Sequence, residues 1–226
     1  MAESRVLLVE GTDDLHVLAH IFKAHGFEGK ITIRDQEGVE KVKKGLDEDY
    51  FAELLADLSV EIKGSEVLAL GIVVDADLDI NARWQSLANR LKELNYKDVP
   101  SMPDPNGTIL FHNEDLPKIG VWLMPDNTLP GMLEDFVQLL IPNEQDKLWQ
   151  RAVKAVDAIP KKERRFVGKK SDKTSKAKIH TYLAWQQRPG VPYGIAIREK
   201  FLTADSPHTN NLMNWIKNLF NLSSSA

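Results

Sequence analysis

Two acidic stretches hold the residues best suited to chemistry. RVLLVEGTDD at 5–14 and VLALGIVVDADLD at 67–79 each begin as an apolar run and end in carboxylates, namely Glu10 in the first and Asp75, Asp77 and Asp79 in the second. Alternate residues of an extended segment point the same way, so the three aspartates are predicted to project together. Carboxylates held that close repel one another unless a cation lies between them. The spacing therefore predicts a magnesium or manganese site, which Glu10 joins if the two strands are neighbours.

Several of these acids have a purely structural alternative. An aspartate that follows a strand often caps the next helix by accepting hydrogen bonds from free backbone N–H groups. That role is open to Asp13 or Asp14 before a helix near Leu15, and to Asp79 before a helix near Asn81. Glu10 is followed by a Gly-Thr turn in which Thr12 is the better cap. Asp75 ends an apolar run, where an unpaired carboxylate is costly.

The residues at this point resemble a known family. The pairing of LVEGTDD with VVDADLD resembles the TOPRIM domain of topoisomerases, primases and OLD-type nucleases. GVWLMPDNTLPGMLEDF at 120–136 and KIHTYLAWQQRPGVPYGIAI at 178–197 resemble small, stand-alone TOPRIM-like proteins of no assigned function, which are allied to the OLD-type nucleases. The resemblance implies a TOPRIM-like, Rossmann-like α/β fold, a metal site and phosphodiester chemistry.

The resemblance also adds a candidate metal ligand. In OLD-type nucleases, acids in a segment comparable to 126–135 bind metal, which implies that role for Glu134, with Asp126 the lesser candidate. The alternative for Glu134 needs no metal. It lies in the first turn of an expected helix that starts at Leu133, where the helix dipole favours negative charge.

The elements that must position these acids alternate between strand and helix. The apolar runs at 5–9 and 67–75 and the alternating segment 31–35 predict strands, and helices are expected over 13–27, 37–46 and 49–62. Crossovers of a dozen or more residues require parallel pairing. A flavodoxin-like strand order places the first and third strands side by side, which is the adjacency that the metal site needs.

The rest of the chain completes a predicted α/β protein. The patterns indicate a hairpin of strands at 108–112 and 118–125, and helices over 82–94, from Leu133 onward, 143–159, 176–187 and 211–220. We therefore expect a TOPRIM-like core over residues 1–160, with a mostly parallel sheet flanked by helices. Residues 161–226 are predicted to form a basic loop and a helical C-terminal extension packed on that core.

The charge is distributed unevenly. Residues 161–178 contain nine basic and two acidic side chains, a net +7, whereas the whole chain carries −4 and the remainder therefore −11. A basic segment on an acidic body predicts phosphate contacts to nucleic acid by Lys169, Lys170 and Lys173. Lys178, which precedes an expected helix, is predicted to offset charge that develops during catalysis. The alternative is a solvated, mobile loop.

For the aromatic and histidine side chains near these segments, a structural role is an alternative to a functional one. Tyr182 and Trp185 are candidate stacking platforms for bases, but their helical spacing is also that of core residues. His16 and His112 are predicted to be surface or strand-end residues rather than metal ligands.

Composition excludes several classes of protein. The 226 residues suit one sizeable domain and contain no cysteine, so neither a disulfide framework nor a thiolate metal site is possible. The chain lacks a signal-peptide pattern and an apolar run long enough to span a membrane, which predicts a soluble cytoplasmic protein. GKKSD at 168–172 lacks the preceding glycine and strand of a P-loop. There is also no Ser/His/Asp pattern, topoisomerase tyrosine context or primase zinc module.

The leading hypothesis is a nuclease that uses Mg²⁺ or Mn²⁺, since two such ions ~4 Å apart can activate water and stabilise the transition state. Glu10, Asp75 and Asp77 are predicted to bind the first ion, and Asp79 and Glu134 to complete or share the second. One alternative is a metal-binding nucleic-acid-binding or effector module without efficient catalysis, dependent on a protein partner such as an ATPase or a defence-system component. A small-phosphate hydrolase, which would need no basic segment, is a third possibility.

Overall fold

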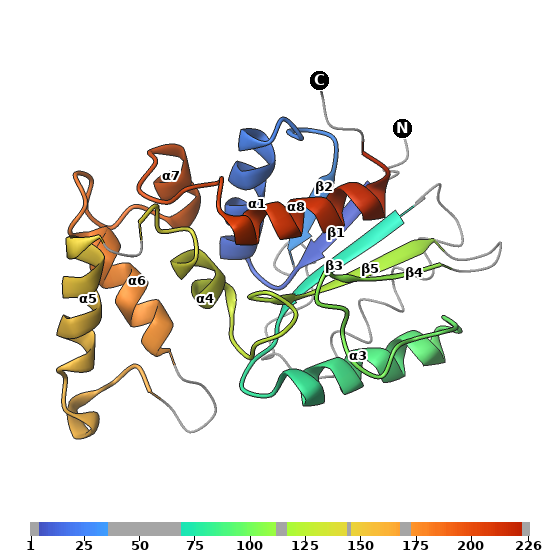
Figure 1. The fold of residues 1–226 in the computed structure, drawn as a ribbon, viewed down its shortest axis with the longest axis horizontal. Helices are drawn as coiled ribbons and strands as arrows, with labels where there is room; N and C mark the ends of the chain where they lie inside the picture. Colours follow the sequence, from blue (N-terminus) through green and yellow to red (C-terminus); the bar gives the residue numbers. More distant parts are fainter. Residues whose placement is uncertain (1–4, 36–68, 112–116, 144–145, 168–172, 223–226) are drawn as a thin grey trace.

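The sheet lies at the centre of the molecule (Figure 1). The computed structural model describes residues 5–35, 69–111, 117–143, 146–167 and 173–222. Within these ranges the strands pair in the order β2-β1-β3-β5-β4. The strands are β1 (Arg5–Val9), β2 (Thr32–Asp35), β3 (Ala69–Asp75), β4 (Thr108–Leu110) and β5 (Lys118–Met124). All pairs are parallel except β4 with β5. This arrangement confirms the predicted α/β, Rossmann-like fold.

The first and third strands are neighbours, as expected. Val9 pairs with Val73 in β1 and β3, and Asp75 pairs with Met124 in β3 and β5. The carboxyl ends of these three parallel strands therefore meet at one edge of the sheet.

Alternate strand residues face two separate cores. Val6 and Leu8 of β1 and Ile72 of β3 pack with Trp84 and Leu91 of α3 (Ile80–Glu93) on one face. The opposite face of the sheet packs against α1 (Thr12–Ala24) and α8 (Pro207–Phe220). Burial on both faces explains why these strands are continuous apolar runs.

Helix α8 lies close against the sheet because two paired glycines make room for it. Gly71 of β3 and Gly120 of β5 are direct partners. A Cβ on Gly120 would lie 2.7 Å from Leu219, and one on Gly71 would lie 3.1 Å from the same side chain.

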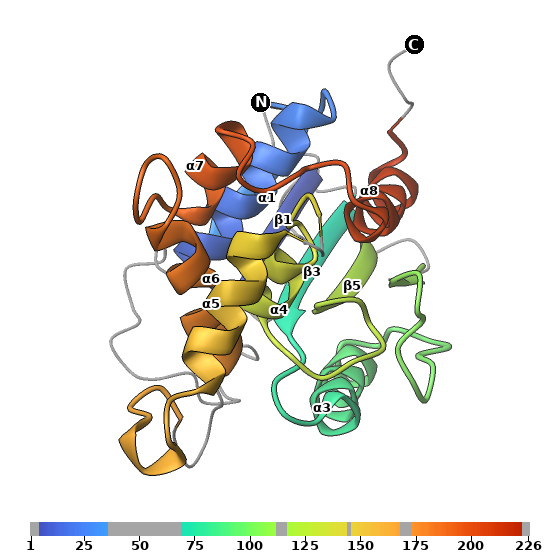
Figure 2. The same ribbon diagram turned by 60° about the vertical axis from the view of Figure 1, so that its left-hand side comes forward.

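The remaining helices gather beyond the carboxyl edge of the sheet (Figures 1 and 2). They are α4 (Leu133–Gln138), α5 (Lys147–Asp157), the short 3₁₀ helix η2 (Lys161–Glu163), α6 (Thr174–Ala184) and α7 (Tyr193–Arg198). Helix α6 packs on α4 and α5, and α7 packs on α1.

Two expectations about this layer need correction, and a third is confirmed in part. The basic segment 161–178 is not one loop, since it opens with η2 and its last five residues begin α6. The predicted helix 143–159 covers only Lys147–Asp157. Tyr182 is buried, which confirms its core alternative, whereas Trp185 is 44% exposed.

Some predictions fall outside the described residues. These are the helices expected over 37–46 and 49–62, the residues His112, Lys169 and Lys170, and most of the turn between β4 and β5. The division of the chain at residue 160 stays a prediction. None of the described helices is long and apolar enough to cross a membrane.

Candidate functional site

Glu10 and Asp75 meet at the carboxyl edge of the sheet. The backbone N–H of Asp75 donates a hydrogen bond to Glu10 Oε2 at 2.6 Å. Arg83 of α3 donates from Nη2 to Glu10 Oε1 at 3.0 Å and from Nε to the Asp75 carbonyl at 3.1 Å. Burial raises the pKa of Glu10, although Arg83 opposes the rise. The predicted juxtaposition of the two acids is confirmed, and Arg83 clamps both strand ends.

The Asp75 side chain points toward α4. Its Oδ1 accepts a hydrogen bond from the Leu133 N–H at 2.9 Å, which places the start of α4 beside the end of β3. Burial, followed by the nearby charges of Glu10, Asp14 and Glu134, raises the pKa of Asp75 to about 9. Four carboxylates therefore act on one another at this edge.

Asp14 is the site residue whose role the sequence did not reveal. Gly11 is the N-cap residue of α1, so neither Asp13 nor Asp14 caps the helix as that alternative expected, although hydrogen bonds from the N–H groups of Asp14 and Gly11 reach the Asp14 side chain and lower its pKa. Its side chain is 7% exposed, and Oδ1 has no hydrogen-bond partner among the described residues. Burial raises the pKa of Asp14 to about 7, with Glu10 and Glu134 adding to the effect. The available signal was its spacing of three and four from the buried Val17 and Leu18.

Glu134 joins a second polar network on the other side of the cluster. It is 5% exposed, and its Oε1 lies 2.7 Å from Lys176 Nζ of α6. The Tyr193 hydroxyl donates to the same Oε1 at 3.5 Å and lies 2.9 Å from His180 Nε2. Burial lowers the pKa of Lys176, but the hydrogen bond that Lys176 donates to Glu134 and the nearby charges of Glu134, Asp13 and Asp75 together outweigh burial, so the net shift is upward. Lys176 is therefore a charged lysine at the acidic cluster.

The aspartates after Asp75 do not project together. Strand β3 ends at Asp75, and Asp77 has a left-handed φ of 55°, with its carbonyl accepting a hydrogen bond from the Gly131 N–H. Asp79 Oδ1 accepts hydrogen bonds from the N–H groups of Asn81 and Ala82. The predicted alternation is therefore wrong because the strand stops, and the capping alternative for Asp79 is confirmed. Asp77 still lies near enough to raise the pKa of Glu10, after the larger effect of burial.

Three further candidates lie apart from the cluster or at its margin. Asp126 Oδ1 accepts hydrogen bonds within its own turn, from Thr128 and Leu129. Lys178 Nζ lies 3.0 Å from Asp157 Oδ1 of α5, so Lys176 rather than Lys178 contacts an acid of the site. Lys173 is exposed just before α6.

The donors of this cluster match those that a hard cation prefers. Glu10, Asp14, Asp75 and Glu134 supply only carboxylate oxygens, the ligands favoured by Mg²⁺ and Mn²⁺. Asp14 Oδ1 has no partner among the described residues, and the raised pKa values of Asp14 and Asp75 show that the charged forms of these two carboxyl groups are disfavoured without a cation. In the part of the chain described, no three His, Asp or Glu side chains converge as a ready-made metal site. The residue types are therefore those that bind a hard cation, but binding requires their side chains to turn toward one another.

Comparison with known proteins places the chain by family alone. The model of the family described as "Protein of unknown function (DUF3226)" matches residues 4–221. Neither the curated proteins nor the solved structures gave a match.

Proposed function

The chain belongs to the DUF3226 family of proteins of unknown function, and we propose that it hydrolyses phosphodiester bonds with Mg²⁺ or Mn²⁺, as a nuclease of the OLD type that its TOPRIM-like motifs resemble. One observation carries the proposal. Four carboxylates, which belong to α1, β3, α4 and the residue directly after β1, affect one another at the carboxyl edge of a parallel sheet, and one buried oxygen has no partner in the described residues. This edge is where Rossmann-like sheets place their ligands.

Each residue of the cluster has a role in the proposed reaction. Asp14, Asp75 and Glu134 would hold the cation, with Glu10 and Asp77 beside them. When bound, such an ion lowers the pKa of water and stabilises charge on a phosphoryl oxygen. Lys176, already charged beside Glu134, would donate to a phosphate oxygen as negative charge develops there. The substrate would be nucleic acid, held by the basic segment that contains Lys169, Lys170 and Lys173, in a cytoplasmic protein.

The proposal can be tested by cleavage of plasmid and single-stranded DNA and of RNA with Mg²⁺ or Mn²⁺. Asp75→Asn keeps the Oδ1 acceptor for Leu133 but removes the charge, so we expect a loss of at least about 10²-fold in rate. The matched control is Asp98→Asn, an identical change at an exposed residue, which should cleave like the wild type. Equal cleavage by Asp75→Asn and wild type would rule out this site.

A second candidate function follows from the Arg83 clamp. Both Glu10 carboxylate oxygens are engaged, one by Arg83 and one by the Asp75 N–H. That favours a module that binds metal and nucleic acid but cleaves only when a protein partner, such as an ATPase or a defence-system component, releases Glu10. Arg83→Gln should then increase cleavage by the isolated protein. A protein that binds metal but stays silent in this variant and with each candidate partner would be a non-catalytic module.

A further inference from the structure

A cavity of about 560 Å³ lies away from the acidic cluster, at the other end of α1. Asp14 is in the first turn of α1, whereas His20, Lys23 and Ala24 of its last turns line the cavity. The opposite wall comes from the end of α7 and the segment 200–205, with Pro142 at one side. We call this cavity the α1–α7 pocket. Its volume is in the range of sites for small organic ligands.

The charged side chains of the α1–α7 pocket are mostly cations. Lys23, Arg198 and Lys200 line it together with one acid, Asp205. Lys200 makes no ion pair with any described residue, whereas Lys23 pairs with Glu28 and Arg198 with Glu199. The Lys23–Glu28 pair is 62% and 65% exposed, so water screens it and an anionic ligand can replace Glu28 at little cost.

Two histidines add oriented polar groups to the same walls. His20 Nδ1 lies 2.8 Å from the His16 carbonyl, and His25 Nε2 lies 2.8 Å from the Ala204 carbonyl. A carbonyl oxygen only accepts, so each of these nitrogens carries the hydrogen. The other ring nitrogen is then an acceptor in the neutral form and a donor in the protonated form. Either form can hydrogen-bond a phosphate, which carries both oxygens and, when protonated, a hydroxyl.

The pocket also has an apolar part. Ala24 and Pro142 line it with exposed apolar surface, whereas Ile197 and Leu202, which also border it, are only 6% and 0% exposed. An inorganic anion alone would leave this surface in contact with water. A ligand that carries a planar or apolar body beside its charged group would cover it.

We propose that the α1–α7 pocket binds a small organic phosphate of nucleotide size. Its phosphate contacts Lys23 and Lys200 at the rim, and its ring lies against Ala24 and Pro142. This inference is independent of the metal and nuclease proposal, because no residue of the acidic cluster lines the pocket.

Titration calorimetry on the full chain tests the pocket, with the four nucleoside monophosphates as probes. EDTA is present throughout, so that phosphate cannot bind through a metal at the acidic cluster. We expect one site per chain for at least one nucleotide, and binding at least tenfold weaker for the matching nucleoside and for inorganic phosphate. The nucleoside lacks the charge, and inorganic phosphate lacks the ring.

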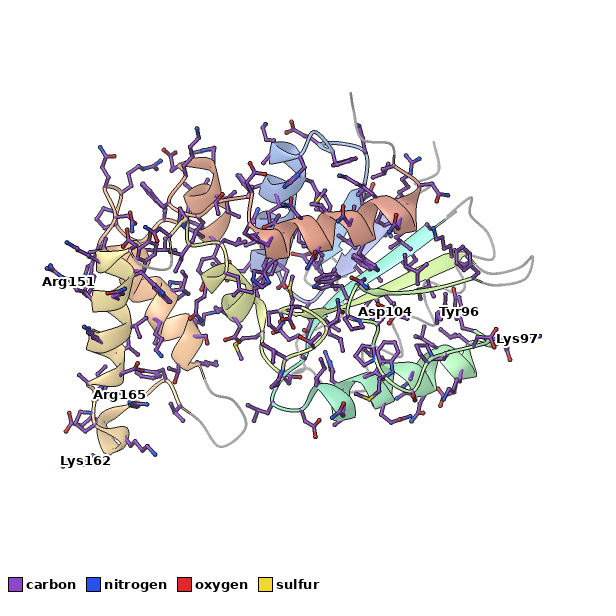
Figure 3. The ribbon with its side chains drawn as sticks, in the orientation of Figure 1. Tyr96, Lys97, Asp104, Arg151, Lys162 and Arg165 are labelled. Carbon is purple, nitrogen blue, oxygen red and sulfur yellow. The ribbon has the colours of Figure 1, made fainter. Side chains whose placement is uncertain are left out.

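Variants locate the binding. Lys200→Glu should weaken nucleotide binding by tenfold or more, and Ala24→Phe, which fills the cavity without changing charge, should weaken it similarly. Lys97→Glu makes the same charge reversal at an exposed residue near the end of α3, far from α7 (Figure 3), and should leave it unchanged. Circular dichroism checks that each variant is folded, and Lys23→Gln replaces any variant that is not. No saturable binding at millimolar nucleotide, or equal binding by Lys97→Glu and the pocket variants, would overturn the proposal.

Discussion

Among single residues, Asp75 is the one whose negative charge most clearly destabilises the folded protein in the absence of a cation. Its pKa rises from 3.8 in the unfolded chain to about 9 in the native protein, chiefly because of burial. The charged form is therefore disfavoured on folding, so this cost is absent below pH 3.8 and grows as the pH rises toward 9.

Asp75→Asn should consequently stabilise the metal-free protein, and more so at pH 8 than at pH 5. The expected gain in the free energy of unfolding is at least about 1 kcal/mol at pH 8, since one pKa unit corresponds to about 1.4 kcal/mol. Urea unfolding in EDTA at both pH values measures it. A gain that is the same at both values, or a loss at pH 8, would contradict the raised pKa.

Lys176 and Lys178 provide a matched pair for testing the charge at the site. Lys176 contacts Glu134, whereas Lys178 contacts Asp157 on α5. On the proposed function, Lys176→Met should lower the cleavage rate by about 10²-fold, the usual effect of removing a donor to developing negative charge. Lys178→Met loses only a partly exposed ion pair and should cleave nearly as fast as the wild type. A larger loss of cleavage rate in Lys178→Met than in Lys176→Met would mean that Lys178 is the residue that offsets the developing charge.

The site residues differ in how far the sequence could predict them. Glu10 and Asp75 were predictable because each ends an apolar strand. Lys176 was not predictable from the sequence, because it is one of several lysines in this stretch. Only the direction in which each lysine faces on α6 distinguishes it from the others. Two residues along a helix turn the side chain by roughly 200°, so Lys176 reaches α4 while Lys178 reaches α5. That direction depends on how α6 packs between the two helices.

Among the elements, α8 and the central strands depend on each other through Gly120. A Cβ there would meet Leu219 Cδ2 at 2.7 Å and Trp215 at 3.0 Å. Gly120→Ala should therefore lower the free energy of unfolding by about 1–3 kcal/mol, the usual cost of overpacking a core.

A double mutant separates this clash from other effects of the alanine. Leu219→Ala alone leaves a cavity and is itself destabilising. In Gly120→Ala/Leu219→Ala the new methyl group occupies part of that space, so the double variant should be more stable than the sum of the single changes predicts. Strict additivity, measured by urea unfolding, would mean that the two residues do not clash.

The strands were predictable as elements, whereas the turn after β3 was not. Continuous apolar runs identify strands that are buried on both faces, and β1 and β3 are such runs. The alternating acids of VVDADLD predict that the strand continues through Asp79. Instead, Asp77 adopts φ 55° and Asp79 caps α3. Side-chain capping and the hydrogen bond from Gly131 to Asp77 decide that turn, and neither is visible in a periodic pattern.

For the molecule as a whole, a group of exposed basic side chains lies at one end of its long axis (Figure 3). Arg151, Lys162 and Arg165 lie at the end opposite Lys97 and Asp104 (Figure 3). Exposed basic residues of α5, η2 and the turn after it form what we call the α5 basic surface, which comprises Lys147, Arg151, Lys154, Lys161, Lys162 and Arg165. The sequence indicated only the part from residue 161 onward, because the three basic residues of α5 are separated by apolar ones and join the others only through the fold.

The α5 basic surface is expected to bind nucleic acid without taking part in catalysis. Helix α5 packs on α6, which carries Lys176 to the acidic cluster, so on the proposed function a phosphate backbone lying on α5 would be guided toward that edge. Replacing Arg151, Lys162 and Arg165 together by Glu should weaken nucleic-acid binding and reduce the slope of log affinity against log salt by about 2–3, since each phosphate contact contributes close to one.

The control for this triple variant is Lys97→Glu, which lies at the other end of the molecule and should change neither affinity nor slope. Fluorescence anisotropy at several salt concentrations measures both. At saturating substrate the triple variant should cleave at the wild-type rate, because none of its three residues contacts the acidic cluster. An unchanged salt slope would mean that the α5 basic surface is merely solvated, and a lower rate at saturation would place part of it in the reaction.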